Sequence, residues 1–462
     1  MARNDPISVA GLMDAAPLAG LPLWVASLSF LIMILDGFDL QAMAFAAPAL
    51  AVDWSIKREL LGPVLIASII GMGPGSVALG WLADRIGRKA AFCICITLLS
   101  LGSLLCISAA NLTQLFIYRV VCGLGLGGAA PLAAALIAEW MPARWRGAGV
   151  AVVIVAIPLG GMLGAALAQH LIPAHGWRAV FVVGGVFPLL LAALAAVQLP
   201  ESPKFLARDP ARRARLAAVL NRLVGEPRFS ADDHFLAEPQ SPSAGSELLQ
   251  LLRSPYLATT LLLWAAFSCN TLALYGFVNW LPTVLSGPGA ATGSGLSGSF
   301  AFNAGGIVGA IGGALLIGRL GSRAVGTSVA LLGALVTAAI GLAVVGSDRT
   351  PSVGAEVLLL VMLAGACLHG MQAYLYAVGA HSYPTAIRGS GVGCASAVAR
   401  VGGVLSSGVG SALFAFGLSL SVFFFTLAVV IGVTAASFFA LRSHIPPRPA
   451  LSATVGVVAP RR

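Results

Sequence analysis

The sequence predicts an all-α polytopic membrane protein with twelve transmembrane helices in two pseudo-symmetric six-helix bundles. Three observations support this fold class. First, hydrophobic residues make up 58% of the 462 positions and charged residues only 10%, with a mean hydropathy of +0.94, whereas a soluble domain is about 25% charged. Second, the apolar residues form blocks of about 20 or more residues, enough to cross a bilayer as a helix. Third, one motif recurs in both halves of the chain. The composition therefore excludes an ordinary soluble enzyme.

Charged and Pro/Gly-rich breaks separate the apolar blocks. The predicted spans lie near 22–49, 60–81, 90–110, 114–140, 147–171, 177–198, 255–285, 299–318, 324–346, 355–380, 389–414 and 418–441. The only long polar stretch lies between the sixth and seventh spans. We therefore expect an N-terminal six-helix half at 1–200, a cytoplasmic central loop at 201–253, and a C-terminal six-helix half with a cytoplasmic tail at 254–462. Within the loop, residues 207–224 form either a basic helix on the membrane surface or part of a solvated connector.

The net charge of +10 is spread over short loops instead of a folded basic domain with stacking aromatic residues, which argues against nucleic-acid binding. With the N-terminus placed inside, 21 Lys and Arg residues fall on the inner side and 4 on the outer side. This bias predicts a bacterial-type inner-membrane protein with both termini in the cytoplasm. The seven cysteines all lie in apolar blocks, with neither metal-ligand nor disulfide spacing, so we expect no metal and no cofactor.

An internal repeat supports the division into two halves. Residues 138–150 align without a gap with residues 380–392. The shared positions are Pro142, Arg146, Gly147, Gly149 and Val150 in the first copy and Pro384, Arg388, Gly389, Gly391 and Val392 in the second. Both copies end a span on the same side. The two halves are therefore predicted to run parallel, as in carriers built from two six-helix bundles.

The loop after the second span carries a further motif, over residues 80–89. Its members are Gly80, Asp84, Arg85, Gly87, Arg88 and Lys89. Glycine permits a tight turn and close helix approach, and a carboxylate among guanidinium groups can latch neighbouring helix ends in one conformation and release them in another. A loop that is merely basic and broken by glycine would explain the arginines, but not Gly80, Asp84 and Gly87 together. The matching loop of the second half, at 318–323, has no acidic residue.

This loop resembles the signature loop of the major facilitator superfamily, and the resemblance extends over nearly the whole chain. Arg119 with the glycines at 123, 125, 127 and 128 is similar to the fourth-helix pattern of that superfamily, and residues 200–206 are similar to the segment after its sixth helix. The resemblance implies the major facilitator fold and alternating access. It also implies gating roles for the loop residues and for Glu139 and Arg146, with Arg388 as the repeat mate of Arg146.

The glycines at 123, 125 and 128 also satisfy a dinucleotide-binding fingerprint. No strand is expected before them and no acidic residue follows about 20 positions later, so that interpretation fails. Close helix packing is the better explanation, as for Gly305, Gly309 and Gly313 at four-residue spacing.

Two acidic residues, Asp36 and Asp39, lie near the middle of the first span. Their spacing puts both carboxylates on one helix face, at a depth where an ionised side chain is costly. Low dielectric and a neighbouring carboxylate both favour the protonated form, so these residues are the candidates for proton coupling. Two alternatives stay open: Asp39 caps a helix break at Gly37, or one of the two carboxylates pairs with an arginine.

Within the superfamily, the chain resembles the aromatic acid:proton symporter family. The resemblance lies in Asp-Gly-Phe-Asp at 36–39, in Asn-Trp-Leu-Pro at 279–282, and in the segment 383–393 after the tenth span. It implies that the partners of the protein are protons and a small aromatic carboxylate, such as benzoate or a hydroxybenzoate, taken up across the lipid bilayer by a carrier that functions as a monomer.

Arg400, halfway along the eleventh span, is the main candidate for the substrate carboxylate, because a planar guanidinium forms bidentate pairs with carboxylates. The alternative is a permanent pair with an aspartate of the first span. Arg119 and His369 have either a role in substrate or proton contact or a structural one. The other candidates form an aromatic and amide wall suited to a ring, although each can instead face lipid or a neighbouring helix. They are Asn279, Trp280, Gln372 and Tyr374.

The rival functions are a carrier of another substrate in the same superfamily, such as another organic anion, a sugar or an exported drug, and, further away, a membrane-embedded enzyme. The acidic pair in the first span argues against sugar. An enzyme would need a nucleophile with its base, or a set of metal ligands, at one depth. The ionisable residues near the midplane are Asp36, Asp39, His369 and Arg400, which supply neither.

Overall fold

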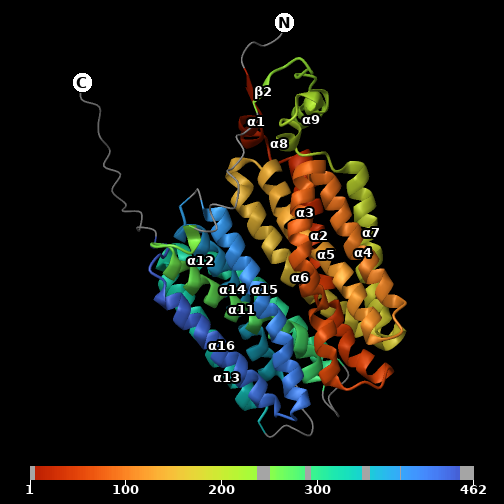
Figure 1. Ribbon diagram of the computed structural model, residues 1–462, viewed down its shortest axis with the longest axis vertical. Helices are drawn as coiled ribbons and strands as arrows, with labels where there is room; N and C mark the ends of the chain where they lie inside the picture. The colour runs from red at the N-terminus through yellow and green to blue at the C-terminus, as the bar shows by residue number, and fades with distance from the viewer. Residues whose placement is uncertain (1–5, 237–249, 287–292, 346–353, 385–386, 448–462) are drawn as a thin grey trace, which may run out of the picture.

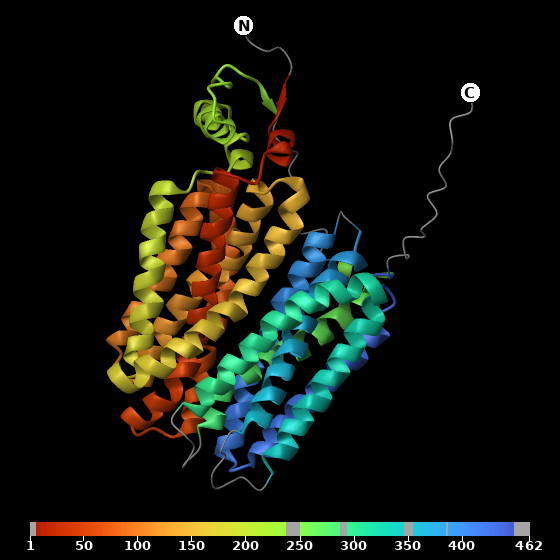
Figure 2. The same cartoon turned by 180° about the vertical axis from the view of Figure 1, so that it is seen from behind.

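The computed structural model describes residues 6–236, 250–286, 293–345, 354–384 and 387–447, and long helices dominate it (Figures 1 and 2). Eleven described helices are long and apolar enough to cross a membrane. Before the central loop these are α2 (Leu21–Asp53), α3 (Gly62–Ile86, preceded by the 3₁₀ turn Arg58–Leu61), α4 (Arg88–Ile107), α5 (Leu112–Trp140), α6 (Ala143–His175) and α7 (Arg178–Gln198). After it they are α11 (Leu257–Leu285), α13 (Ser322–Ala343), α14 (Ala355–Ser382), α15 (Arg388–Ala415) and α16 (Leu420–Ala440).

A further long helix, α12 (Ser294–Leu320), lies between α11 and α13 in the chain and packs mainly against α14 and α6. With it, each predicted span corresponds to one helix, and the ends agree within about five residues. Local chemistry explains several ends. Gly87 (φ +106°) and Gly321 (φ +79°) adopt backbone conformations that favour glycine, and they separate α3 from α4 and α12 from α13. The Asn111 side chain accepts a hydrogen bond from the Gln114 amide and caps α5.

Glycines set the closest helix crossings. A Cβ at Gly123 of α5 would overlap the Ser68 carbonyl of α3, and a Cβ at Gly309 of α12 would overlap the Ala366 carbonyl of α14. The packing interpretation of these glycines is therefore confirmed. The repeat recurs in the contacts, because Gly160 of α6 abuts the α2 backbone just as its mate Gly402 of α15 abuts the α11 backbone.

The first eleven described residues and the central loop build a small cap at one end of the N-terminal helices (Figure 1). Strand β1 (Ile7–Ser8) pairs in parallel with β2 (Phe235–Leu236) in one short sheet, which the sequence analysis did not predict. Between them the chain forms α1 (Val9–Ala15), α8 (Pro203–Leu206), a 3₁₀ turn and α9 (Arg213–Val224). We call residues 6–16 and 203–236 the N-terminal cap.

Helix α9 falls inside the predicted segment 207–224, but its apolar side does not rest on lipid. Leu216 and Leu220 are buried in one cluster with Val9 and Met13 of α1. The surface-helix interpretation is therefore wrong, because the chain itself supplies the apolar partner, and this part of the connector is a folded unit. Residues 237–249 of the predicted loop and 448–462 of the predicted tail lie outside the described residues.

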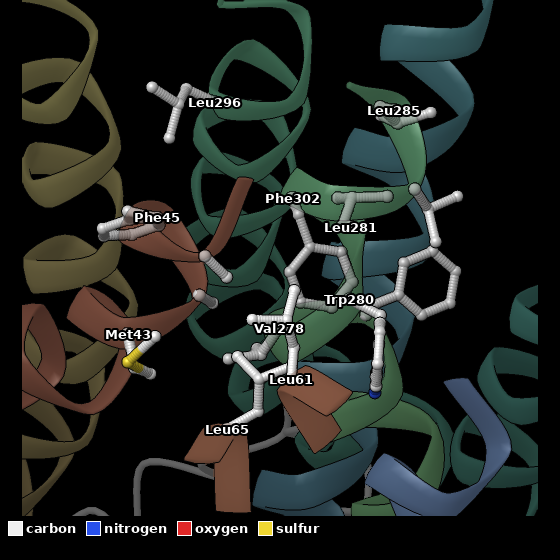
Figure 3. Close-up of a cluster of buried hydrophobic side chains, with 14 of the residues drawn as sticks. Met43, Phe45, Leu61, Leu65, Val278, Trp280, Leu281, Leu285, Leu296 and Phe302 are labelled. Atoms are coloured by element: carbon white, nitrogen blue, oxygen red, sulfur yellow. The ribbon is translucent and has the colours of Figure 1, made fainter. Parts of the chain in front are cut away.

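The two sets of helices meet at one end and diverge at the other, as both views show (Figures 1 and 2). We call the end at which α3, α5, α12 and α14 finish the basic end, and the opposite one the far end. At the far end a single apolar cluster joins both sets. Leu61 and Leu65 of the N-terminal set lie beside Val278 and Trp280 of α11 (Figure 3). Towards the basic end, each set has its own cluster.

Candidate functional site

Asp39 lies in the middle of the N-terminal set and is fully paired. Its side chain is 0% exposed, and Arg119 Nη1 of α5 donates to its Oδ2 at 2.9 Å. Arg119 Nη2 also donates to the Asp39 backbone carbonyl at 2.8 Å, and Ser103 Oγ of α4 donates to Oδ1 at 2.5 Å. The thiol of Cys122, one turn after Arg119, donates to Oδ2 at 2.7 Å. Both oxygens of this carboxylate are therefore hydrogen-bonded by donors of its own half.

Asp36, one turn earlier on α2, is 2% exposed, and its Oδ1 has no hydrogen-bond partner. The charges that act on it are those of Asp39 and of Arg400 from the other half. Of the two alternatives for the acidic pair, the helix break is wrong, because α2 continues unbroken through Gly37, whose Cα abuts the Ile157 carbonyl of α6. The pair with an arginine exists, but it joins Asp39 to Arg119.

Arg400 of α15 is partly buried, and its Nη1 has no hydrogen-bond partner. It is not locked to either aspartate by an ion pair in the described structure. Tyr275 of α11 lies in the field of both Arg400 and Asp36, and it packs against α15 beside Gly403. The structure thus gathers an unpaired carboxyl of one half, an unpaired guanidinium of the other and an aromatic ring.

The remaining wall candidates divide into two groups. Asn279 has an unpartnered Nδ2, and Gln372 accepts a hydrogen bond from Asn270 at 2.7 Å. By contrast, Trp280 packs on Gly410 and Phe414 in the far-end cluster, and the Tyr374 hydroxyl lies against Gly313 in the core of the C-terminal set.

His369 of α14 is held locally. Its Nδ1 lies 3.1 Å from the Gly365 carbonyl of the preceding turn, and its ring lies 5.3 Å from that of Phe302. These contacts match the hydrogen-bonded core role that the sequence left open. Among the described residues, no group of three or more His, Cys, Asp or Glu side chains is placed to hold a metal ion.

At the far end, polar contacts reinforce the apolar closure. Gln41 of α2 and Asn303 of α12 exchange two amide hydrogen bonds, of 3.0 and 2.9 Å, between the two halves. Arg58 donates to the carbonyls of Thr283 and Ser286 at the end of α11, at 3.4 and 2.8 Å. These residues belong to no recognisable sequence motif, although Gln41 and Asn303 are amides inside apolar spans.

The gating candidates other than Arg388 lie at the basic end of the N-terminal half. Arg88 bridges Asp84 at 2.9 Å and Glu139 at 3.4 Å, and Arg208 of the cap lies 3.7 Å from Asp84. Arg85 instead stacks over the Trp81 ring at 4.0 Å. A latch therefore exists between α3, α4, α5 and the cap.

Other members of the gating set have separate roles. A Cβ at Gly87 would overlap the Glu201 carboxylate, which accepts the Lys89 amide at 3.1 Å, whereas Gly80 has open space around it. Arg146 pairs with Asp14 of the cap, so Glu139 and Arg146 are not each other's partners. Arg388 is the first residue of α15, in the other half.

The chain is similar to known membrane transport proteins in both sequence and fold. A family model described as Major Facilitator Superfamily matches residues 29–406. The chain is 34% identical to a gallate transporter of Pseudomonas putida, over 99% of each chain. It is 33% identical to a 4-hydroxybenzoate transporter of Pseudomonas aeruginosa, over 89% of this chain and 91% of that protein. A crystal structure of a D-xylose-proton symporter superposes with a TM-score of 0.70 at 17% identity, covering 93% of this chain and 99% of that one. The expected fold is thereby confirmed.

Proposed function

Since the chain belongs to the major facilitator superfamily, we propose that it is a proton-coupled importer of an aromatic carboxylate in the bacterial cytoplasmic membrane. Members of this superfamily are carriers rather than enzymes, and the relatives named for gallate and 4-hydroxybenzoate transport support an aromatic acid as the substrate class. The basic end faces the cytoplasm in this proposal, in keeping with the excess of Lys and Arg in its loops.

The proposal rests on two groups of opposite charge from the two halves, Asp36 and Arg400, which form no ion pair in the described structure. Each is buried or partly buried, each has an atom without a hydrogen-bond partner, and each lies in the field of the other. A substrate carboxylate that binds Arg400 neutralises the guanidinium. Asp36 then faces a buried site without a counter-charge, which is unfavourable unless it takes up a proton. Substrate and proton therefore enter the occluded state together, and either alone leaves an unpaired charge.

Asp39 is the second proton-coupling residue of the proposal, and its role differs from that of Asp36 because it is already paired with an arginine. Protonation of Asp39 would release the Arg119 guanidinium that it now holds. Arg119 then becomes free for a substrate carboxylate or for a proton relay. Because Ser103 and Cys122 also stabilise the ionised form, Asp36 is the first proton acceptor and Asp39 the later one.

The two ends of the protein differ in how closely the halves meet, and this difference supports a mechanism of alternating access. The far end is closed by the shared apolar cluster and by the Gln41–Asn303 bonds, while the halves are separate towards the basic end. This corresponds to a state open to the cytoplasm. Importing the substrate requires the opposite state, in which the far-end contacts part and the basic-end latch of Asp84, Arg88 and Glu139 engages both halves.

Uptake into proteoliposomes tests the proposal. An inward proton gradient should drive accumulation of radiolabelled 4-hydroxybenzoate or benzoate, and a protonophore should abolish it. Arg400→Gln should remove uptake, while Arg319→Gln, an exposed arginine at the end of α12, should leave it intact. If folded protein takes up none of these acids, the substrate class is wrong. If accumulation survives the protonophore, the proton coupling is wrong.

A further inference from the structure

Arg58 lies between the two halves at the far end. It begins the 3₁₀ turn before α3, and Leu61 of the same turn lies beside Val278 and Trp280 of α11 (Figure 3). The Arg58 side chain is partly buried, and its Cζ lies 5.8 Å from the centre of the Phe414 ring of α15. A charged residue of the N-terminal set is therefore held against two helices of the C-terminal set.

The guanidinium of Arg58 holds two oxygen atoms at the end of α11. Its Nη2 donates to the Ser286 carbonyl at 2.8 Å, and its Nη1 donates to the Thr283 carbonyl at 3.4 Å. The last carbonyls of a helix have no partner within the helix and carry a partial negative charge, so Arg58 caps α11 from the other half. An ionised carboxylate also offers two oxygen atoms to an arginine, and it adds a full opposite charge.

No carboxylate among the described residues forms an ion pair with Arg58. The acidic residues nearest to it in the chain bridge other bases, since Glu59 lies 3.9 Å from Lys57 and Asp53 lies 3.2 Å from Arg178. Within the described ranges, the hydrogen-bond acceptors of Arg58 are the two α11 carbonyls. When the halves part at the far end, both carbonyls leave with the C-terminal set. The guanidinium then stands at the entrance with neither an acceptor nor a counter-charge.

We propose that Arg58 is an entrance site for the substrate, which captures the carboxylate of the aromatic acid in the state open at the far end. This inference rests on the proposed function, which supplies the anionic substrate and the opening. In the open state the carboxylate takes the place of the two α11 carbonyls. The acid then passes to Arg400, and the carbonyls return to Arg58 when the far end closes. One guanidinium thus captures the anion and afterwards seals the entrance.

The half-saturating concentration of external 4-hydroxybenzoate for uptake into proteoliposomes tests the assignment, because capture and closure predict different signs. Loss of a residue that only closes the far end favours the state open to external substrate, so this concentration should fall or stay the same. Loss of the capturing residue should raise it. We expect Arg58→Gln to raise it about fivefold, equivalent to about 1 kcal/mol. Gln41→Leu, which weakens the closure alone, should not raise it.

The matched control is Lys57→Gln, which removes the same charge from the adjacent position. The Lys57 side chain is 81% exposed and makes no contact with α11, so the half-saturating concentration should stay within about twofold of the wild-type value. Thermal unfolding shows whether each variant is folded. An Arg58→Gln value no higher than that of wild type would overturn the inference. An equal rise in Lys57→Gln would also overturn it, because the effect would then belong to the charge of the loop.

A second measurement needs only the wild type. Salt screens the attraction between charges in water, so the half-saturating concentration should rise with the external ionic strength. Wild-type uptake that is insensitive to salt would overturn the inference even if Arg58→Gln does not fold. Failure of the wild type to take up any aromatic acid would instead overturn the proposed function, and the inference with it.

Discussion

Asp36 and Asp39 lie three residues apart on the same helix face but have opposite surroundings. Asp39 is bound by an arginine, a serine and a cysteine, whereas Asp36 Oδ1 is bound by no group. The difference arises from neighbouring helices, because α4 and α5 both reach Asp39 with donors. Substitution of these two carboxylates should therefore affect the stability of the protein to different extents.

Asp39→Asn should destabilise the protein much more than Asp36→Asn. The first change leaves the buried Arg119 guanidinium without its counter-charge, which typically costs about 3–5 kcal/mol, whereas the second replaces a carboxyl whose Oδ1 has no partner. Thermal unfolding of the detergent-purified variants measures the difference. Equal unfolding temperatures for the two variants would show that the Asp39–Arg119 pair does not stabilise the fold.

The sequence supported the prediction that these residues share a face, and a pair between one of them and an arginine was one of the alternatives left open. It could not identify which arginine, because Arg119 and Arg400 both lie inside apolar spans. The choice depends on where α5 and α15 lie relative to α2 in the folded protein, which no local pattern of the sequence indicates. Ser103 and Cys122 were missed for the same reason, since a serine and a cysteine in an apolar block have no distinguishing pattern.

At the scale of elements, the crossing of α12 and α14 depends on backbone contact. A Cβ at Gly309 would overlap the Ala366 carbonyl, whereas Gly312, three residues on, has open space around it. Gly309→Val should therefore separate the two helices, and overpacking of this kind costs about 1–3 kcal/mol. Gly312→Val is the matched control. Thermal unfolding should fall for the first variant only, and a similar fall for both would mean that loss of helix flexibility, and not the crossing, is responsible.

The segment after α16 docks on the turn between α12 and α13 through Ser322. Ile445 donates its amide to Ser322 Oγ at 2.8 Å, and His444 Nδ1 lies 3.3 Å from the same oxygen. Burial, together with the nearby charge of Arg323, holds the pKa of His444 below its usual value of 6.5. The docked segment thus favours neutral histidine, and docking weakens as the pH falls from about 6.5 towards the lowered pKa, because the released histidine takes up a proton.

Hydrogen exchange at residues 442–447 measures this docking. Protection at the Ile445 amide should decrease below about pH 6.5 in the wild type, after correction for the intrinsic rate. His444→Gln, which cannot titrate, should show no such decrease. A decrease of equal size in both proteins would assign the pH response to another group.

The helices were predictable because each is bounded by charge, proline or glycine, and because apolar length alone identifies a membrane span. The pairing of β1 with β2 was not predictable. Each strand has two residues, which is too short for an alternating pattern, and the partners are separated by most of the N-terminal half. The apolar side of α9 was recognisable as such, but the cluster that it shares with α1 could be identified only from the fold.

At the scale of the whole molecule, closure at the far end depends on contacts between the halves. Gln41→Leu should shift the protein towards the state open at that end, because it removes both amide bonds to Asn303 and leaves the Asn303 Oδ1 unpaired, a loss of about 1–3 kcal/mol. Gln114→Leu, a glutamine at the same end that bonds only within its own half, is the matched control.

Spin labels at Val52 and Phe416, both exposed at the far end and on opposite halves, report this equilibrium. The three partly exposed native cysteines, at 93, 269 and 394, are first replaced by alanine. Longer distances should gain population in Gln41→Leu and not in Gln114→Leu. An unchanged distribution in Gln41→Leu would mean that the apolar cluster alone keeps the far end closed.

The N-terminal cap has a consequence for how the protein is made. Ile7 pairs with Phe235, and Val9 and Met13 are buried in one cluster with residues of α9. A ribosome therefore exposes the first residues long before it has produced the segment that covers them. Six helices are inserted into the bilayer before the partner strand of β1 has been synthesised. Completion of the cap thus marks the moment at which the first half of the protein has been fully synthesised.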